Sequence, residues 1–354
     1  MINLSYGHIS KKFINFDYVR RVIKNFLYNI NFSQYTTPGG SKLLREEIAK
    51  KYLSDNKKID YCCTSVSTNL SFFILLSLFT KAKKIGIFTP LYLNYYKQVL
   101  DVKSKHIVTY SYDDLANASI LFSELTAGDV CIIVLPNNPT GQVISLKALE
   151  KNLKLMYGKG ISCIIDISWI YSVFTDDKKM SIDELAKLAI KYNSVLLVGF
   201  TKIFGVTSIR CSGVIAPPNI ISSFIKQHDC LAVSCGSLDE LLVYNFLHDK
   251  SPVDWVDVGK YLKKQSTFII DVLKKTGIKF EFSQPEAGIF LYVRFPKINN
   301  ASEISEKCKN NNLLIYPSNA FEERSDGFRL CYCNSKKEIK EGIKILSRII
   351  KEAN

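Results

Sequence analysis

The residues Val195-Leu-Leu-Val-Gly-Phe-Thr-Lys-Ile-Phe-Gly-Val-Thr-Ser-Ile-Arg210 join an apolar run to one lysine and, eight residues later, one arginine. The run from Val195 to Phe200 predicts a buried strand, and residues 201–205 predict the turn after it, at the edge where open α/β sheets bind ligands. A lysine just past a buried strand is partly desolvated, which lowers its pKa and suits Lys202 to Schiff-base chemistry. Arg210 supplies a planar cation for a phosphate. Alone, the pair also fits a surface lysine followed by an unrelated arginine.

The composition is that of an ordinary globular protein. The chain has 354 residues, of which 47% are hydrophobic and 12% aromatic, enough for one large and one smaller packed unit. No apolar run reaches the roughly 18 residues that a membrane span needs, and the N-terminus lacks the pattern of a signal peptide. We therefore expect a cytoplasmic protein without a membrane partner.

The charge and the metal-binding residue types are both dispersed. The net charge is +14, but the lysines are spread over predicted helices and loops, which favours a solvated basic surface, then an anionic substrate or cofactor, over nucleic acid. The ten cysteines include no CxxC pair and the four histidines are scattered. This pattern predicts reduced cysteines and no metal site.

Strands and helices alternate from residue 84 onward, which predicts a mostly parallel sheet flanked by helices. The predicted strands are residues 84–90, 129–135, 161–166, 195–200 and 213–216. Polar or aromatic side chains close several of them: Tyr92, Asn138, Asp166 and Lys202. We expect these four side chains to gather at one edge of the sheet.

A different pattern follows residue 236. Two helices, 238–247 and 256–275, precede short strands between residues 280 and 332 and a closing helix at 336–351, which predicts a smaller α+β unit. We expect a large domain of residues 35–245 and a small domain of residues 1–34 plus 246–354.

The N-terminal part contains three further predicted helices. An amphipathic segment runs from Tyr18 to Tyr28, and a helix capped by Ser41 covers residues 41–53. The hydroxyl-rich stretch from Thr64 to Asn69 leads into an apolar helix at residues 70–79. Free backbone N–H groups and hydroxyls make such a helix entry an anion site by geometry, and a helix cap without a ligand is the alternative.

The order and spacing of these landmarks resemble a known family. The turn Asn138-Pro-Thr-Gly141 after a buried strand, with Asp166, Lys202 and Arg210, resembles the fold-type I pyridoxal-phosphate enzymes. The likeness is to class I/II aminotransferases, close to the histidinol-phosphate aminotransferase and threonine-phosphate decarboxylase branch, and it runs from Tyr35 to Arg329.

The resemblance implies a fold, a cofactor and a reaction. The fold would be an aspartate aminotransferase-like large domain beside a smaller α+β domain, and the cofactor pyridoxal 5′-phosphate. The amino group of an α-amino acid would pass to a 2-oxo acid through a Schiff base at Lys202.

It also implies roles for individual residues. Lys202 would hold the cofactor and move the substrate's α-proton, and Asp166 would pair with the ring nitrogen. Arg329 and Asn138 would bind the substrate, with Arg329 on its α-carboxylate, and Asn138 would also hydrogen-bond the phenolic oxygen of the cofactor ring. Tyr35 would reach the partner's phosphate across a dimer interface, so a homodimer with shared active sites is implied. The implied cofactor contacts are Lys202, Asp166, Asn138, Tyr92, Ser67, Thr68, Arg210, Thr201, Trp169 and Tyr35.

Four positions depart from the family pattern. Asp166-Ile-Ser-Trp169 stands where the family usually has Asp-x-Ala-Tyr, so an indole replaces a phenol. Gly199 replaces a phosphate-binding serine of many relatives, Val66 replaces a glycine, and Arg210-Cys-Ser-Gly213 replaces Arg-x-Gly. These departures leave a decarboxylase, elimination or cyclisation enzyme of the same fold as an alternative. A catalytically degenerate binding protein is a second alternative.

Overall fold

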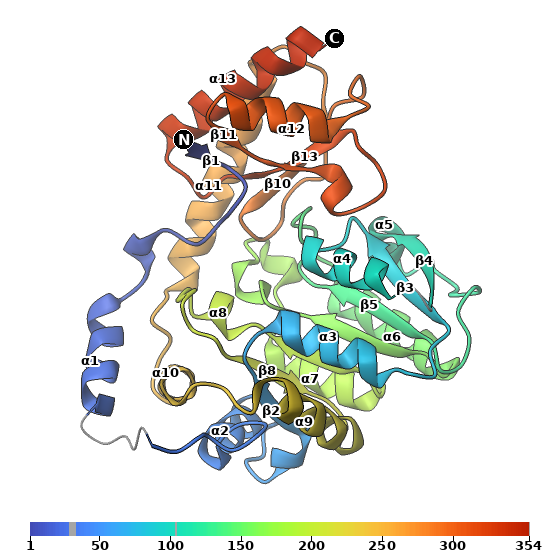
Figure 1. Cartoon of the computed structure of the whole chain (residues 1–354), viewed down its shortest axis with the longest axis vertical. Coiled ribbons are helices and arrows are strands. Elements are labelled where there is room, and N and C mark those ends of the chain that lie inside the picture. Colours follow the sequence, from blue (N-terminus) through green and yellow to red (C-terminus); the bar gives the residue numbers. More distant parts are fainter. Residues whose placement is uncertain (28–32, 103–104, 354) are drawn as a thin grey trace.

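The computed structural model describes residues 1–27, 33–102 and 105–353, and it contains one large sheet with a smaller α/β unit beside it (Figure 1). The large sheet has seven strands in the order β2 (Cys62–Ser65), β8 (Ser212–Ile215), β7 (Val195–Val198), β6 (Ser162–Asp166), β5 (Val130–Val134), β3 (Lys84–Thr89) and β4 (His106–Ser111). The neighbours from β7 to β4 are parallel, and β8 is antiparallel to both β7 and β2. The predicted mostly parallel sheet is confirmed.

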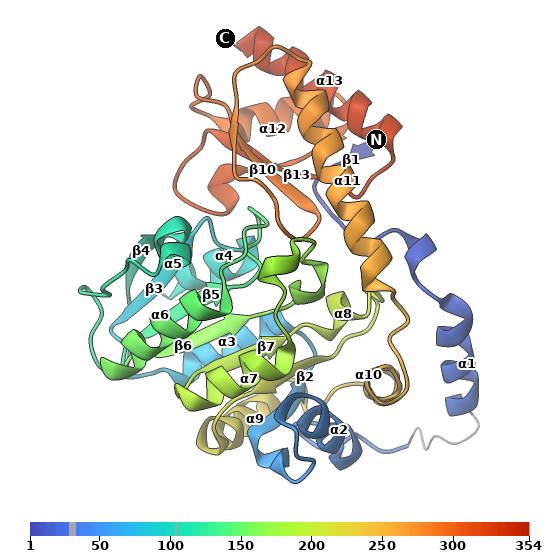
Figure 2. The ribbon, with the colours of Figure 1, turned by 180° about the vertical axis from the view of Figure 1, so that it is seen from behind.

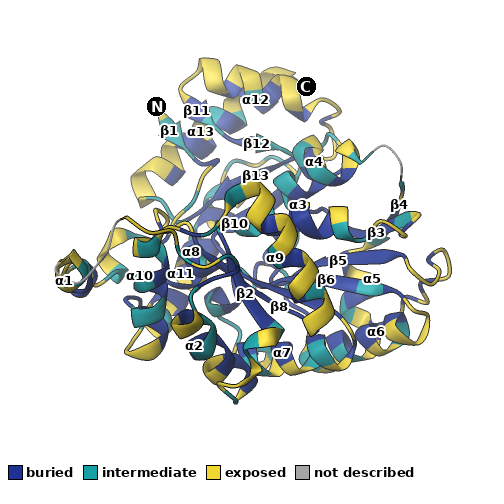
Figure 3. Cartoon of the chain, turned by 60° about the horizontal axis from the view of Figure 1, so that its bottom comes forward, coloured by how far each residue is buried: buried dark blue, intermediate teal, exposed yellow. Residues whose placement is uncertain are grey.

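The central strands are continuous apolar runs because helices cover both of their faces. Alternate residues of β5 enter different cores: Cys131 and Ile133 pack on one side, and Val130, Ile132 and Val134 on the other. In Figure 3 the strands are buried, whereas the outer faces of the surrounding helices are exposed. The helices of this layer are α2 (Lys42–Leu53), α3 (Thr68–Leu78), α4 (Leu93–Asp101), α5 (Tyr112–Asn117), α6 (Leu146–Gly158), α7 (Ile182–Lys191), α8 (Phe200–Ile203), α9 (Pro218–Ala232) and α10 (Ser237–His248).

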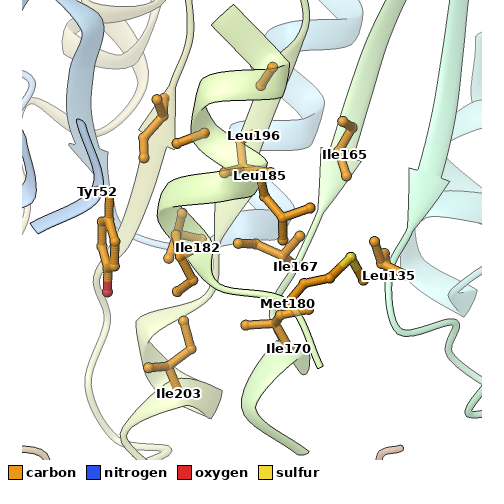
Figure 4. Packing of buried hydrophobic residues seen from close by; sticks show 14 of the residues in the cluster. Tyr52, Leu135, Ile165, Ile167, Ile170, Met180, Ile182, Leu185, Leu196 and Ile203 are labelled. Carbon is orange, nitrogen blue, oxygen red and sulfur yellow. The ribbon is translucent and has the colours of Figure 1, made fainter. Parts of the chain in front are cut away.

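Helix α7 illustrates how one face of the sheet is covered. Ile182 and Leu185, three residues apart on this helix, pack in one cluster with Ile165 of β6 and Leu196 of β7 (Figure 4). Its N-terminus is set by a capping box between Ser181 and Glu184. The spacing of the apolar residues therefore determines which face of α7 is buried, and the capping box determines where the helix begins.

The smaller unit is built around α11 (Trp255–Lys274), which runs along it from the large sheet (Figure 2). Its antiparallel sheet has the order β12 (Tyr316–Pro317), β13 (Gly327–Cys331), β10 (Phe290–Arg294) and β9 (Glu281–Phe282). The N-terminal strand β1 (Ile2–Asn3) pairs in parallel with β11 (Leu313–Leu314), so both ends of the chain meet here. Helices α12 (Ala301–Asn310) and α13 (Lys336–Ala353) complete it.

The core clusters assign the N-terminal segments to different units. Leu4 and Ile9 pack in the cluster of the smaller unit, whereas Tyr18 of α1 (Phe16–Leu27) packs in the cluster of the large sheet. The ring centroids of Tyr18 and Phe246 of α10 are 5.8 Å apart. Tyr28, the predicted end of the first helix, lies outside the described residues.

Several element boundaries differ from the sequence predictions. The strand predicted to reach Phe200 ends at Val198, and Lys202 lies on the one-turn helix α8 instead of in a loop. The helix predicted to begin at Leu70 begins at Thr68, because Ser67 caps it by accepting a hydrogen bond from the Leu70 N–H. Strands β2 and β4 lie outside the predicted strands. No helix of the described residues is long and apolar enough to cross a membrane.

Candidate active site

A pocket of about 380 Å³ opens where β5, β6 and β7 end. Val134 and Asp166 are the last residues of β5 and β6, and Gly199 directly follows β7. The smaller unit closes the opposite side with residues of β10, β12 and β13. All predicted site residues except Tyr35 line this pocket: Lys202, Asp166, Asn138, Tyr92, Ser67, Thr68, Arg210, Thr201, Trp169 and Arg329.

Asp166 is buried in the pocket and held by two donors. Its carboxylate accepts hydrogen bonds from the Tyr95 hydroxyl and from the Ser168 N–H, the latter at 2.7 Å. Burial raises the pKa of Asp166, and these hydrogen bonds oppose that rise. Tyr95 itself stacks on Phe72 of α3 with ring centroids 3.9 Å apart, so the donor is fixed in place.

Lys202 lies on α8 and reaches the pocket from the end of β7. Burial lowers the pKa of its ammonium group, and the positive charges of Arg210 and Arg329 lower it further. Its Nζ atom lies 5.5 Å from the centroid of the Trp169 ring. An amine in this environment loses its proton more easily than a surface lysine, which is the requirement for a nucleophile or a base.

Arg329 is a buried cation without a carboxylate partner in the described part of the chain. Its guanidinium donates to Asn138 Oδ1 at 3.1 Å and to the Ser5 carbonyl at 2.8 Å, and its Nε atom has no partner. Burial lowers the pKa of Arg329 to about 10. A buried, incompletely paired guanidinium that lines a pocket is chemically suited to an anionic ligand such as a carboxylate.

The other end of the pocket suits a phosphate. Ser67 and Thr68 begin α3, and the first N–H groups of a helix have no partner within the helix. Arg210 is exposed and adds a positive charge to the same wall. The Thr201 hydroxyl donates to the Ile209 carbonyl at 2.9 Å, and the Ser212 hydroxyl donates to the Ser65 carbonyl at 3.1 Å.

Tyr35 does not lie in the pocket of its own chain. Its side chain is 87% exposed, on the segment that precedes α2. The neighbouring Thr36 hydroxyl donates to the Cys235 carbonyl at 2.7 Å, which anchors this segment next to α10.

Sequence reasoning missed several residues of the pocket. Tyr95, which supports the pocket residue Asp166 from behind, has the pattern of a core aromatic on α4, because its side chain is fully buried and only its hydrogen bond to Asp166 connects it to the site. Tyr6 lies in an irregular segment after β1 and Tyr316 in the two-residue strand β12, and both segments are too short for a periodicity to predict where the side chains point. Asn94 lies two residues after the predicted Tyr92, and its side-chain amide donates to the Tyr92 hydroxyl at 3.0 Å. The further lining residues are Gly7, Asn69, Leu93, Val134, Ser168, Gly199, Thr207, Ser212 and Phe290.

The departures from the family pattern have visible consequences here. Trp169 is 8% exposed, and its ring meets Phe290 edge to face with centroids 6.4 Å apart. A Cβ atom on Gly199 would lie 2.3 Å from the Ser168 hydroxyl oxygen. The serine of the Asp166-Ile-Ser-Trp169 segment thus occupies the space that a side chain at position 199 would need.

Comparison with known proteins identifies the family. A sequence profile described as "Aminotransferase class I and II" matches residues 1–346. The chain belongs to the class I and II aminotransferases. This aminotransferase is 22% identical to the aromatic-amino-acid aminotransferase 2 of Thermococcus litoralis over 334 residues, 90% of this chain and 85% of the relative. It is also 22% identical to an aspartate aminotransferase of Thermotoga maritima, covering 88% of this chain and 81% of the relative.

Solved structures share the fold. The α-aminoadipate aminotransferase of Thermus thermophilus, complexed with N-(5′-phosphopyridoxyl)-L-leucine, superposes with a TM-score of 0.87 at 17% identity over 99% of this chain and 92% of that chain. A tetra mutant of the aspartate aminotransferase of Thermus thermophilus superposes with a TM-score of 0.84 at 15% identity, covering 98% of this chain and 96% of that chain. The predicted aspartate aminotransferase-like fold is confirmed. The narrower likeness to the histidinol-phosphate branch stays a hypothesis.

The aminotransferase is a transferase that uses pyridoxal 5′-phosphate to move an amino group between an amino acid and a 2-oxo acid. The residues present fit this cofactor. A buried carboxylate suits a protonated ring nitrogen, the N-terminus of α3 suits a phosphate, and a partly buried amine suits an aldehyde. The Nε atom of Arg329 is buried without a hydrogen-bond partner, so this guanidinium keeps an unused donor.

Proposed function

We propose that Lys202 is the catalytic amine of this aminotransferase and that Asp166 sets the electronic state of the cofactor. When bound, pyridoxal phosphate supplies an aldehyde for the substrate amine and a ring that takes up the electron pair left by the α-proton. Lys202 would hold the cofactor and then, through its Nζ atom, take up and return the α-proton. The observation that carries this proposal is the partly buried Lys202, whose lowered pKa suits it to take that proton.

The other predicted residues bind and orient. Arg329 would bind the α-carboxylate through its guanidinium. The Oδ1 atom of Asn138 accepts a hydrogen bond of 3.1 Å from this guanidinium and so holds it in place. Asp166, held by Tyr95 and Ser168, would accept a hydrogen bond from the protonated ring nitrogen of the cofactor. Tyr92 and Trp169 would contact the ring, and Ser67, Thr68, Thr201 and Arg210 would hold the phosphate.

The proposal includes a homodimer and a division into two domains. Tyr35 is exposed and outside its own pocket, which supports its role at the partner's phosphate. A large domain of residues 35–245 and a small domain of residues 1–34 plus 246–354 agree with the two main sheets, although α1 packs on the large sheet. The cytoplasmic location stays a prediction from the sequence.

The test replaces the amine. We expect Lys202→Ala to lower the rate of 2-oxo acid formation by roughly 10³-fold, because the base and the covalent anchor are both lost. Absorbance of the cofactor band, 2-oxo acid release and CO₂ release are measured together. Lys344→Ala, at an exposed position of α13, is the matched control and should behave as wild type. Turnover of Lys202→Ala at the wild-type rate, or CO₂ release without a 2-oxo acid, would contradict the proposal.

A further inference from the structure

We propose that the preferred substrate is an amino acid with an uncharged aromatic or large apolar side chain. This inference rests on the proposed function, because it takes Lys202 and Arg329 as the two points that hold the substrate amine and α-carboxylate. The amine and the α-carboxylate of the substrate must then lie between Lys202 and Arg329. The substrate side chain must contact the pocket residues that flank this line.

Two aromatic rings line this path. The Trp169 ring centroid lies 5.5 Å from Lys202 Nζ, and the Phe290 ring centroid lies 3.9 Å from Arg329 Cζ. The two rings meet edge to face at 6.4 Å, so they form a continuous apolar wall from the amine to the guanidinium. Phe290 is 7% exposed and Trp169 is 8% exposed, so neither ring can move far without disturbing the core of the smaller unit.

Two further aromatic side chains, Tyr316 and Tyr6, line the pocket near Arg329. The Tyr316 ring centroid is 4.9 Å from Arg329 Cζ, and Tyr6 meets Tyr316 edge to face at 5.8 Å. Tyr6 is 65% exposed, so it forms the rim where the pocket opens. A substrate side chain that extends from the line between Lys202 and Arg329 would therefore contact the aromatic rings that line the pocket.

In the proposed function, each charged side chain of the pocket already binds one group of the cofactor or the substrate. Among the described lining residues these groups are Asp166, Lys202, Arg210 and Arg329. They serve the ring nitrogen, the aldehyde, the phosphate and the α-carboxylate. Among the described lining residues of this chain, no further cation is left to pair with the second carboxylate of a dicarboxylic substrate, so moving that carboxylate out of water would be unfavourable. An apolar side chain has no such cost and gains contact with the rings.

The experiment compares side chains in the half-reaction that converts the bound cofactor. The full chain, loaded with pyridoxal phosphate, is mixed with L-phenylalanine, L-leucine, L-aspartate, L-glutamate or L-lysine, and the cofactor absorbance is followed. We expect kcat/KM for phenylalanine to exceed that for aspartate on the order of 100-fold. Independently of catalysis, 3-phenylpropanoate should bind the loaded enzyme more tightly than succinate in a calorimetric titration.

A charge-adding variant tests the wall directly. Tyr6→Arg places a cation at the rim, so we expect it to raise kcat/KM for aspartate at least about tenfold while phenylalanine use falls. Tyr157→Arg, at a 54% exposed tyrosine on α6, is the matched control and should leave the preference unchanged.

The outcomes separate the two proposals. Faster conversion by aspartate or glutamate than by phenylalanine, or tighter binding of succinate, overturns the substrate class and leaves amino-group transfer intact. If no amino acid converts the cofactor, the proposed function fails first and the substrate class fails with it. Unchanged aspartate use by Tyr6→Arg contradicts the placement of the substrate side chain beside this rim.

Discussion

The contact between Ser168 and Gly199 decides which residue can occupy position 199. A Cβ atom built on Gly199 would lie 2.3 Å from Ser168 Oγ, 2.7 Å from its Cβ and 3.0 Å from its Cα. The last of these is a backbone atom, so no rotation of the serine side chain would relieve the contact. Glycine is therefore required because two segments approach closely, and Ser168 also donates its N–H to Asp166.

Gly199→Ser should consequently weaken both the fold and the cofactor site. Overpacking at this contact costs about 1–3 kcal/mol, and the displaced Ser168 would move the Asp166 carboxylate. We expect a lower Tm and a higher dissociation constant for pyridoxal phosphate, measured by thermal unfolding and by absorbance titration.

The control is the same substitution where space is free. Gly158→Ser ends α6, and nothing lies within 4 Å of a Cβ atom there, so its Tm and cofactor affinity should match wild type. Ser168→Gly in the Gly199→Ser background should recover part of the loss. Wild-type cofactor affinity of Gly199→Ser would show that the contact is unimportant.

At the scale of elements, α9 contains a buried ionisable group outside the active site. His228 is buried and stacks on Phe224, one turn earlier, with ring centroids 6.0 Å apart. Burial lowers the pKa of His228, because the charged form would have to leave water. Helix α9 packs on α3, and Phe224 belongs to the core cluster on that side of the large sheet.

The lowered pKa predicts a pH-dependent stability. Below the usual histidine pKa of about 6.5, the unfolded chain binds a proton that folded His228 does not, so the free energy of unfolding decreases as the pH falls. The slope is at most about 1.4 kcal/mol per pH unit, and it ends at the lowered pKa of the folded state. Relative to wild type, His228→Phe should gain stability between pH 7 and pH 5, measured by urea unfolding.

His106→Phe, at an exposed position of β4, is the control for adding an aromatic ring. For each variant, the difference in the free energy of unfolding from wild type is measured at several pH values, and only its change with pH is compared. A packing difference between His and Phe that is the same at every pH therefore has no influence. An unchanged difference between His228→Phe and wild type from pH 8 to pH 5 would contradict this account.

At the scale of the whole molecule, the proposed dimer makes each active site depend on two chains. Mixing refolded Tyr35→Ala and Lys202→Ala chains should restore activity, because one site of each mixed dimer then has an intact Lys202 and the partner's intact Tyr35. Random pairing makes half of the dimers mixed, so about a quarter of all sites should recover. Turnover and the affinity for pyridoxal phosphate are measured before and after mixing.

If Tyr35 acts within its own chain, every mixed dimer lacks an intact site and mixing restores nothing. A Tyr157→Ala chain mixed with Lys202→Ala is the control, because Tyr157 is exposed on α6 and away from the pocket lining. A monomer in sedimentation experiments on the loaded enzyme would also contradict the proposed dimer.

Local patterns predicted much of this structure. The strands ending near Val134, Asp166 and Val198 follow from continuous apolar runs, and the cap at Ser41 follows from its side chain. Edge strand β4 was harder to predict because its exposed residues alternate with few buried ones. The one-turn helix α8 has too few residues to show a periodicity, so the sequence could not predict that Lys202 lies on a helix.

The sequence by itself determined the alternating α/β order, the class of fold and most of the residues that gather at the pocket, because short-range patterns and strand ends encode them. Only the tertiary structure decided that Tyr95 holds Asp166, that Ser168 excludes a side chain at position 199, and that Tyr6 and Tyr316 line the pocket. These relations join segments far apart in the chain. They depend on how closely packed elements approach one another, which no local pattern of residues specifies.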